Sequence, residues 1–300
     1  MDLTIAVVVL AVQAASSPAS AAPASGYVTT ETGRLYYETA GAGPNVILIH
    51  DGLLHRETWD DQFATFARRF HVVRYDRRGY GKSDVPTAPF SNVDDLEDLY
   101  TAVLGKQKAT LIGCSAGGGL AIDFTLAHPE LVERLMLVGA VVAGLAASPH
   151  FLDRGGHYPP EIRDDITKAI AYWSTQDPYF VAPGSAAAHQ RVKALLTANP
   201  QNLRVPWALL RGPRVPALGR LAEIKVPTLI VIGAEDIPDV HAHGGAIQAG
   251  IVGARRVVVR NAGHLVHMEQ PEEFNRLALE FLTAAPFPSP APSPSVLPKP

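Results

Sequence analysis

The stretch ATLIGCSAGGGLAIDFTL (residues 109–126) contains an apolar run, a Gly-x-Ser-x-Gly pentapeptide and a helix-compatible segment. The apolar run predicts a short buried strand, and the segment after the pentapeptide predicts a helix. A Gly-x-Ser-x-Gly between a strand and a helix is typical of a nucleophile elbow, a sharp turn that exposes the serine hydroxyl. Gly113 and Gly117 lack the Cβ atoms that would clash in so sharp a turn. The pattern predicts that Ser115 is a nucleophile.

Length and composition limit the classes of protein that this chain can be. It has 300 residues, 47% of them hydrophobic, which suits one large domain with an ample core. The net charge is −3 and no basic block is present, so nucleic acid is not expected as a partner. The single cysteine, Cys114, excludes an intrachain disulfide, and its place before the serine predicts a buried small side chain.

The two ends of the chain differ from its middle. Residues 3–12 form a nearly unbroken apolar run, too short to span a bilayer but as long as a signal-peptide core. Residues 19–21 (ASA) fit a cleavage site, although the segment before the run carries Asp2 and no Lys or Arg. We therefore expect residues 1–25 to be a signal peptide that directs export to the periplasm or medium. A disordered leader on a cytoplasmic protein is the alternative. Residues 286–300 hold seven prolines and predict an extended, disordered tail.

Strand-like and helix-like segments alternate between the two ends. This alternation predicts an α/β protein with a mostly parallel, doubly wound sheet of about eight strands. The alternation stops between residues 141 and 220, which we interpret as a helical lid inserted into a core formed by residues 26–140 and 221–285. The expected strands are residues 35–39, 45–50, 71–75, 109–114, 134–138, 228–233 and 256–260; the expected helices are residues 59–69, 93–104, 119–127 and 271–284 in the core and 161–173 and 186–198 in the lid.

A nucleophilic serine needs a general base and an acid that orients the base. The expected base is His264, in a Gly-containing loop just after the strand at residues 256–260. The expected acid is Asp236, in a turn-prone stretch after the strand at residues 228–233. Both follow the carboxyl ends of strands, where doubly wound sheets gather functional groups. The chain order Ser115, Asp236, His264 also matches the order of triads built on such an elbow.

Other residues compete for these roles. Glu235 and Asp239 are alternative acids, and Asp239 can instead cap the helix that follows it. His264 has the alternative of a structural histidine in a Gly-containing loop. His241 and His243 suggest a metal pair, but no cysteine or second ligand cluster accompanies them, so we expect solvated histidines and no metal.

The negative oxygen of a tetrahedral intermediate needs preorganised N–H donors. The first expected donor is the backbone of Ala116, the residue after the nucleophile. The second is expected in the loop after the strand at residues 45–50, where Gly52 or Leu53 supplies it. An ordinary structural turn explains Asp51 and Gly52 equally well.

Together these features resemble the α/β-hydrolase superfamily, in its lidded esterase, lactonase and haloperoxidase-like branch, over about residues 26–284. The resemblance is carried by HDGL at residues 50–53 with Trp59, YDRRGYGKS at residues 75–83, the elbow, GAED at residues 233–236, and Gly263-His264 with EQPE at residues 269–272. One departure is that members commonly carry His-Gly where this chain has His50-Asp51. A carboxylate beside the proposed oxyanion hole would disturb an anion there or serve an unusual role.

The resemblance implies a serine hydrolase that cleaves a small carboxylic ester or lactone through an acyl-enzyme, with no metal and no organic cofactor. Acyl transfer, cofactor-free haloperoxidation and C–C bond hydrolysis by the same triad remain alternatives. A ligand-binding receptor with little turnover is the alternative of another class. The resemblance also implies that Asp76 and Arg77 brace a structural turn. Because the apolar run at residues 3–12 is too short to span a bilayer, no integral membrane segment is expected.

Substrate choice is expected to depend on the lid and on the loop after His50. His55, Arg56 and Arg154 are candidates for binding a substrate carboxylate, although solvated surface charge is the interpretation that we favour. Aromatic residues of the lid either line an apolar pocket or pack the lid onto the core: Tyr158, Tyr172, Trp173, Tyr179, Phe180 and Trp207.

Overall fold

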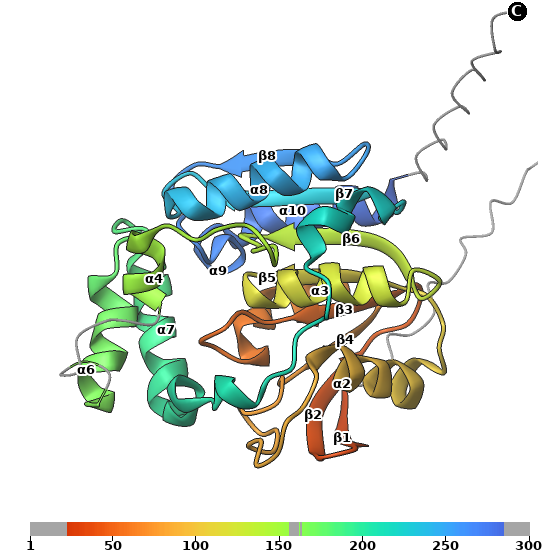
Figure 1. The fold of residues 1–300 in the computed structure, drawn as a ribbon, viewed down its shortest axis with the longest axis horizontal. Helices are drawn as coiled ribbons and strands as arrows, with labels where there is room; N and C mark the ends of the chain where they lie inside the picture. Colours follow the sequence, from red (N-terminus) through yellow and green to blue (C-terminus); the bar gives the residue numbers. More distant parts are fainter. Residues whose placement is uncertain (1–22, 156–161, 163, 285–300) are drawn as a thin grey trace, which may run out of the picture.

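The computed structural model of the protein describes residues 23–155, 162 and 164–284. Its described strands form one eight-stranded sheet. They are β1 (Ala24–Thr30), β2 (Gly33–Ala40), β3 (Asn45–Ile49), β4 (His71–Tyr75), β5 (Ala109–Cys114), β6 (Val132–Val138), β7 (Thr228–Gly233) and β8 (Arg255–Val259). The order in the sheet is β1-β2-β4-β3-β5-β6-β7-β8 (Figure 1). Two of the seven pairings, β1 with β2 and β2 with β4, are antiparallel and the other five are parallel, so the expected α/β class with a mostly parallel sheet is confirmed.

The central strands form because their residues are apolar and are buried on both faces of the sheet. Every residue of β5 and of β7 is buried, and both strands have the bounds that the sequence predicts. β1 is different, because most of its residues are exposed and its sequence carries no continuous apolar run. It was not expected, and it begins at Ala24, inside the predicted leader. Its position is set by pairing with β2, a tertiary interaction that the local pattern does not show.

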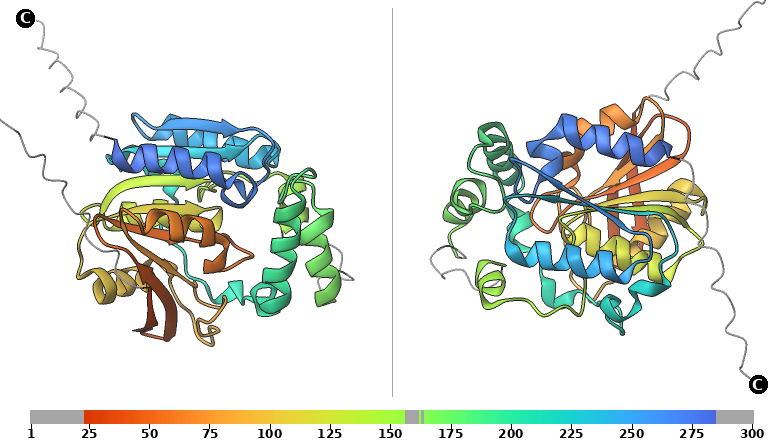
Figure 2. Two further views of the ribbon diagram at one scale, coloured as in Figure 1. Left: turned by 180° about the vertical axis from the view of Figure 1, so that it is seen from behind. Right: turned by 90° about the horizontal axis from the view of Figure 1, so that it is seen from above.

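Helices cover both faces of the sheet, as Figure 2 shows from above. The residues of the two buried clusters place α1 and α10 on one face and α2, α3 and α8 on the other. The helices of the described chain are α1 (Asp60–Phe66), α2 (Asn92–Leu99), α3 (Ala116–Ala127), α4 (Pro149–Gly155), α6 (Ile166–Ala171), α7 (Ala186–Ala198), α8 (Pro238–Gly250), α9 (Val266–Glu269) and α10 (Pro271–Thr283). Shorter helical turns are η1 (Arg56–Trp59), η2 (Tyr100–Leu104), η3 (Tyr172–Gln176), η4 (Pro200–Arg204), η5 (Trp207–Leu209) and η6 (Ala217–Glu223).

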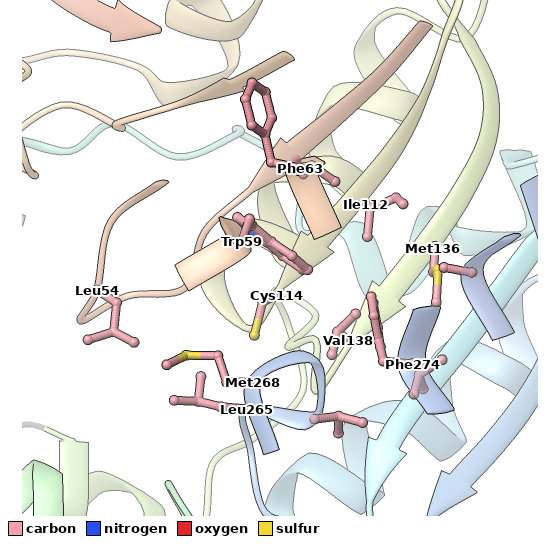
Figure 3. Packing of buried hydrophobic residues seen from close by; sticks show 14 of the residues in the cluster. Leu54, Trp59, Phe63, Ile112, Cys114, Met136, Val138, Leu265, Met268 and Phe274 are labelled. Carbon is pink, nitrogen blue, oxygen red and sulfur yellow. The ribbon is translucent and has the colours of Figure 1, made fainter. Parts of the chain in front are cut away.

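Successive residues of β5 point to opposite faces of the sheet. Ile112 and Cys114 belong to the cluster under α1 and α10, whereas Leu111 belongs to the cluster under α2, α3 and α8. Figure 3 shows Cys114 in the first cluster with Trp59 and Leu265. Burial also raises the pKa of the Cys114 thiol well above its usual range. The prediction of a buried small side chain is confirmed, and a thiol that stays protonated is a poor nucleophile.

Several helices differ from the expected ranges. The expected helix at residues 59–69 is divided into η1 and α1, and the one at residues 93–104 ends in the π-helical turn η2. The long helix α8 lies where the sequence allows a helix after Asp239 but gives no range for it, because three glycines weaken its local helical signal. Burial of its apolar residues against the sheet stabilises it instead.

The β6–β7 connection (residues 139–227) is helical in its described part and contains α4, α6 and α7. These helices lie together beside the ends of the sheet rather than over its faces (Figure 1). α7 has the bounds predicted for a lid helix. It is tied to the core by Arg191, whose guanidinium lies 3.0 Å from Asp60 and 2.8 Å from Asp61 of α1.

Some predicted segments lie outside the described residues. They include nearly all of the predicted leader, the whole proline-rich tail, and Tyr158 in the predicted lid. Within the described chain, no helix combines the length and apolar character needed to span a bilayer.

Candidate active site

The parallel strands bring the three predicted triad residues to one edge of the sheet. Ser115 follows β5, Asp236 follows β7 and His264 follows β8. β6 lies between β5 and β7, and β8 pairs with β7. Carboxyl ends of parallel strands meet at the same edge, which is where α/β proteins commonly bind ligands.

The turn at Ser115 has the strained geometry of an elbow. Ser115 has a φ of 53° and a ψ of −117°, and α3 begins at the next residue. A Cβ atom on Gly113 would collide with the Gly117 carbonyl, and a Cβ on Gly117 would collide with the carbonyl of His50. Only glycine therefore fits at these two positions. The cost of the strained serine is typical of functional sites.

Asp236 and His264 form the hydrogen-bonded pair that the sequence predicts. His264 Nδ1 lies 2.8 Å from Asp236 Oδ2, and both side chains are buried. The other Asp236 oxygen accepts the N–H of Ile237 at 2.8 Å, which fixes the carboxylate. The alternative acids lie elsewhere: Glu235 is exposed, and Asp239 accepts hydrogen bonds from the N–H and hydroxyl of Ser148, both at 2.8 Å.

The loop that carries His264 is held by a half-buried carboxylate, that of Glu269. Glu269 accepts the N–H groups of Gly263 and Leu265, the two neighbours of His264. It also accepts the N–H of Ala182 in the β6–β7 connection at 2.7 Å. Burial raises the Glu269 pKa, and these hydrogen bonds oppose the shift. Glu269 belongs to the EQPE motif at residues 269–272, for which the sequence gives no role. Its spacing of five residues from His264 is the one sequence feature that indicates this contact.

The two predicted positions for the second oxyanion donor differ in what their N–H groups do. The Leu53 N–H donates to Asp51 Oδ1 at 2.7 Å, so Leu53 is not a free donor, which corrects one of the two expectations. The Gly52 N–H donates to none of the described residues. A Cβ on Gly52 would lie 3.6 Å from the Cβ of Ala116, so Gly52 and Ala116 are neighbours. Ala116 opens α3, and the first N–H groups of a helix have no acceptor within it.

His50 and Asp51 brace the loop beside these donors. His50 Nε2 accepts the N–H of Arg77 at 2.9 Å, while its Nδ1 lies 2.8 Å from the Asp51 carbonyl. Burial lowers the pKa of His50 well below its usual value, so the ring is neutral and Nδ1 carries the proton. Asp51 Oδ1 also accepts the Leu54 N–H at 2.9 Å. The Asp51 side chain thus closes a tight turn just before η1.

A pocket of about 200 Å³ joins these residues. Its polar side is formed by Asp51, Gly52, Ser115 and His264. Its apolar walls come mainly from the β6–β7 connection, with Leu53 from the loop after β3. The residues of the connection are Phe151, Trp173, Phe180 and Trp207.

Three of the predicted lid aromatics therefore line the pocket, and two others do not. Tyr172 packs edge-on against Trp173, with ring centres 5.2 Å apart, and Tyr179 packs against His150 at 5.7 Å. Trp207 also lines a second pocket of about 240 Å³, whose walls include Ala116. The indole of Trp207 therefore separates the two pockets.

His55 and Arg56 are not solvated surface residues, contrary to the interpretation favoured from the sequence. Arg56 is buried and pairs with Glu38 and Asp76, each at 2.8 Å. His55 is buried and faces the side chain of Asn202 at 3.2 Å. These partners come from distant parts of the chain, so the local sequence gives no sign of the burial. The side chain of Arg154 lies outside the described part of the structure.

The two histidines on α8, His241 and His243, were expected to be solvated, and one of them is not. His243 is buried and accepts the N–H of Val142 at 3.1 Å, so it is not solvated. Burial lowers its pKa, which favours the neutral ring that accepts this hydrogen bond. In the described residues, no group of three or more His, Cys, Asp or Glu side chains is arranged to hold a metal ion.

Comparisons with known proteins find hydrolases that are similar to this chain. The chain is 28% identical over 266 residues to the carboxylesterase YbfK of Bacillus subtilis (strain 168), which covers 85% of this chain and 86% of the relative. It is 28% identical over 279 residues to the 2-hydroxy-6-oxo-6-phenylhexa-2,4-dienoate hydrolase of Comamonas testosteroni, covering 83% and 91%. The solved structure of Est816, described as an N-acyl homoserine lactone degrading enzyme, matches with a TM-score of 0.68 at 25% identity. That match covers 85% of this chain and all of the other.

A family model described as the alpha/beta hydrolase family matches residues 46–277. This range contains Ser115, Asp236 and His264 together with strands β4 to β8 and all of β3 except its first residue. The range is more than half of the chain, and the sheet order and the elbow agree with the match. The chain belongs to the α/β-hydrolase family.

Proposed function

We propose that the protein is a serine hydrolase that cleaves a small carboxylic ester or lactone through an acyl-enzyme on Ser115. The observation that carries this proposal is the 2.8 Å contact between His264 and Asp236, with His264 and Ser115 lining the same pocket. A relative that is a carboxylesterase and a similar structure of a lactone-degrading enzyme support the substrate class. The pocket volume of about 200 Å³ suits a small acyl group.

In the proposed reaction His264 removes the proton of the Ser115 hydroxyl while Oγ attacks the substrate carbonyl. Asp236 keeps the proton on Nδ1, which leaves Nε2 as the basic atom, and it stabilises the imidazolium that forms. The leaving alcohol takes the proton from His264. Water then attacks the acyl-enzyme, with His264 again as the base.

The oxyanion forms twice in this reaction, and we assign its donors to the N–H groups of Ala116 and Gly52. Both belong to rigid elements, one at the start of α3 and one in the turn fixed by Asp51. Loss of one donor of this kind typically lowers kcat by about 10²–10³. Because both donors are backbone groups, the geometry of the turns matters more than the side chains there.

A second candidate is C–C bond hydrolysis by the same residues. It is favoured by the 28% identity to the dienoate hydrolase of Comamonas testosteroni. The two candidates share the nucleophile and the base and differ in the leaving group. An ester releases an alcohol, whereas a C–C substrate releases a carbanion that is protonated at carbon.

We also propose that the predicted signal peptide directs export. Cleavage after Ala21 would leave β1, which begins at Ala24, intact in the mature protein. The measurement is the N-terminal sequence of the protein from a secreting host. A mature protein that still begins at Met1 contradicts the proposal.

The proposed function is tested with a fluorophosphonate probe and p-nitrophenyl acetate. The folded protein should be labelled at Ser115, and Ser115→Ala should abolish both labelling and turnover. His264→Ala should abolish turnover while the far-UV circular dichroism spectrum stays that of the wild type. A folded protein that is not labelled, or a variant that keeps full activity, contradicts the assignment. A receptor with little turnover would show slow ester cleavage at saturating substrate.

A further inference from the structure

Asp51 is a buried carboxylate at the reacting end of the active-site pocket. Its side chain is 1% exposed, and it lines the pocket together with Ser115 and His264. Its neighbour Gly52 is the proposed second oxyanion donor. The chain therefore places a side-chain carboxylate beside the backbone that would contact the scissile carbonyl.

The two oxygens of Asp51 have different roles. Oδ1 accepts the N–H groups of Leu53 at 2.7 Å and Leu54 at 2.9 Å, so it is fully used by the turn. Oδ2 is buried and accepts a hydrogen bond from none of the described residues. The turn thus fixes the carboxylate through one oxygen and leaves the other without a donor among the described residues, in a residue that lines the pocket.

A buried acceptor without a donor is costly, and for a charged group more so. Oδ2 is shielded from solvent by the protein even without a substrate, so water does not satisfy it. A substrate in the pocket either donates a hydrogen bond to Oδ2 or leaves the acceptor unsatisfied. A substrate group that can only accept hydrogen bonds would also face the electron pairs of Oδ2, and the two would repel.

We infer that Asp51 is a specificity-determining residue whose Oδ2 accepts a hydrogen bond from a hydroxyl or N–H group close to the scissile carbonyl of the substrate. The inference rests on the proposed ester or lactone hydrolysis and defines its substrate class. The preferred substrates are hydroxy- or amino-substituted acyl esters and lactones. Plain alkanoyl esters and esters with an ether oxygen at this position are poorer substrates.

The test compares three esters that differ at one position: ethyl 3-hydroxybutyrate, ethyl 3-methoxybutyrate and ethyl butyrate. The hydroxyl can donate, the methoxy oxygen can only accept, and the third ester has neither group. Wild-type kcat/KM should be at least about tenfold higher for the hydroxy ester than for the methoxy ester, the size expected for one hydrogen bond to a charged group.

Asp51→Asn is the matched variant. Its side-chain oxygen can keep the hydrogen bonds to Leu53 and Leu54, while the amide turns the pocket-side acceptor into a donor. The hydroxy-to-methoxy ratio should fall towards one, because the amide can donate to either oxygen. Asp94→Asn removes one charge from an exposed residue of α2 and should leave the ratio unchanged.

The outcomes separate this inference from the proposed function. Turnover of all three esters with the same ratio in the wild type and in Asp51→Asn overturns the role of Asp51 alone. A wild-type ratio near one overturns it even if Asp51→Asn does not fold. Absence of any ester turnover by the labelled, folded wild type overturns the proposed function and, with it, this inference.

Discussion

The carboxylate of Glu269 receives the Gly263 N–H on both of its oxygens, at 3.0 and 3.1 Å. Gly263 immediately precedes His264, and Leu265 on the other side donates to the same carboxylate at 3.2 Å. The backbone on both sides of the proposed base is therefore fixed by one half-buried side chain. Glu269 is a positioning residue that acts through His264.

Glu269→Ala should lower kcat more than it changes KM. The substitution leaves the N–H groups of Gly263, Leu265 and Ala182 without their acceptor, at a cost of about 1–3 kcal/mol for each donor that stays buried. We expect a loss of at least about tenfold in kcat and a lower melting temperature. Glu269→Gln keeps one acceptor oxygen and should recover part of both losses. Glu272→Ala, at an exposed position of α10, is the control and should change neither.

Asp236→Asn should lower kcat by about 10³–10⁴ without unfolding the protein. An amide nitrogen facing Nδ1 favours the wrong tautomer of His264, which removes the basic nitrogen from Nε2. Steady-state kinetics on p-nitrophenyl acetate measure the effect. Asp239→Asn is the control, because Asp239 contacts Ser148 instead of the imidazole. Equal losses in the two variants would contradict the choice of Asp236 as the acid.

Gly139→Ala should disturb the His264–Asp236 pair directly. Gly139 has a φ of 51°, and a Cβ there would lie 3.0 Å from His264 Nδ1 and 3.2 Å from Asp236 Oδ2. Gly105→Ala is a matched control, because Gly105 has a φ of 56° and no atom lies within 4 Å of the added Cβ. Both variants should lose about 1–2 kcal/mol of unfolding free energy from the left-handed backbone. Only Gly139→Ala should also lose about tenfold or more in kcat.

Asp123 should make stability depend on pH. Burial raises its pKa to about 6, from 3.8 for an ordinary aspartate. A raised folded-state pKa means that the stabilisation is complete below about pH 4 and is lost as the pH rises through about 6. The full shift corresponds to about 3 kcal/mol, and the observed change should be smaller because the side chain is only partly buried.

Urea unfolding at pH 4, 5, 6 and 7 measures this effect. The difference in unfolding free energy between the wild type and Asp123→Asn should change sign or shrink across this range, with the variant gaining relative stability at pH 7. A difference that stays constant from pH 4 to pH 7 would show that the Asp123 carboxyl titrates normally.

The parts of the fold that could be predicted are those with a local signal. β5 and β7 are continuous apolar runs buried on both faces, and their bounds follow directly from the sequence. Asp236 could be proposed because it follows β7, and His264 because it lies in the Gly-containing loop after β8, an edge strand with mostly exposed residues. The carboxyl ends of parallel strands meet at one edge of the sheet, so residues that follow different strands are expected at the same edge.

The parts that could not be predicted depend on contacts between distant segments. The burial of Arg56 follows from its pairing with Glu38 and Asp76, which lie 18 and 20 residues away along the chain. The loss of Leu53 as a donor follows from the side-chain rotamer of Asp51, which no pattern of residue types reveals. The role of Glu269 depends on α9, which ends at Glu269 and brings its carboxylate back to the Gly263 N–H.

The backbone hydrogen bond from the His264 N–H to the Tyr179 carbonyl, 2.8 Å long, has a consequence for protein engineering. Together with the contact from Ala182 to Glu269, it makes residues 179–182 part of the support of the catalytic loop. Exchanging the whole β6–β7 connection with that of a relative would therefore replace the pocket walls and this support at once. A graft that leaves residues 177–185 in place changes the walls around Phe151 and Trp207 while the loop of His264 keeps its partners.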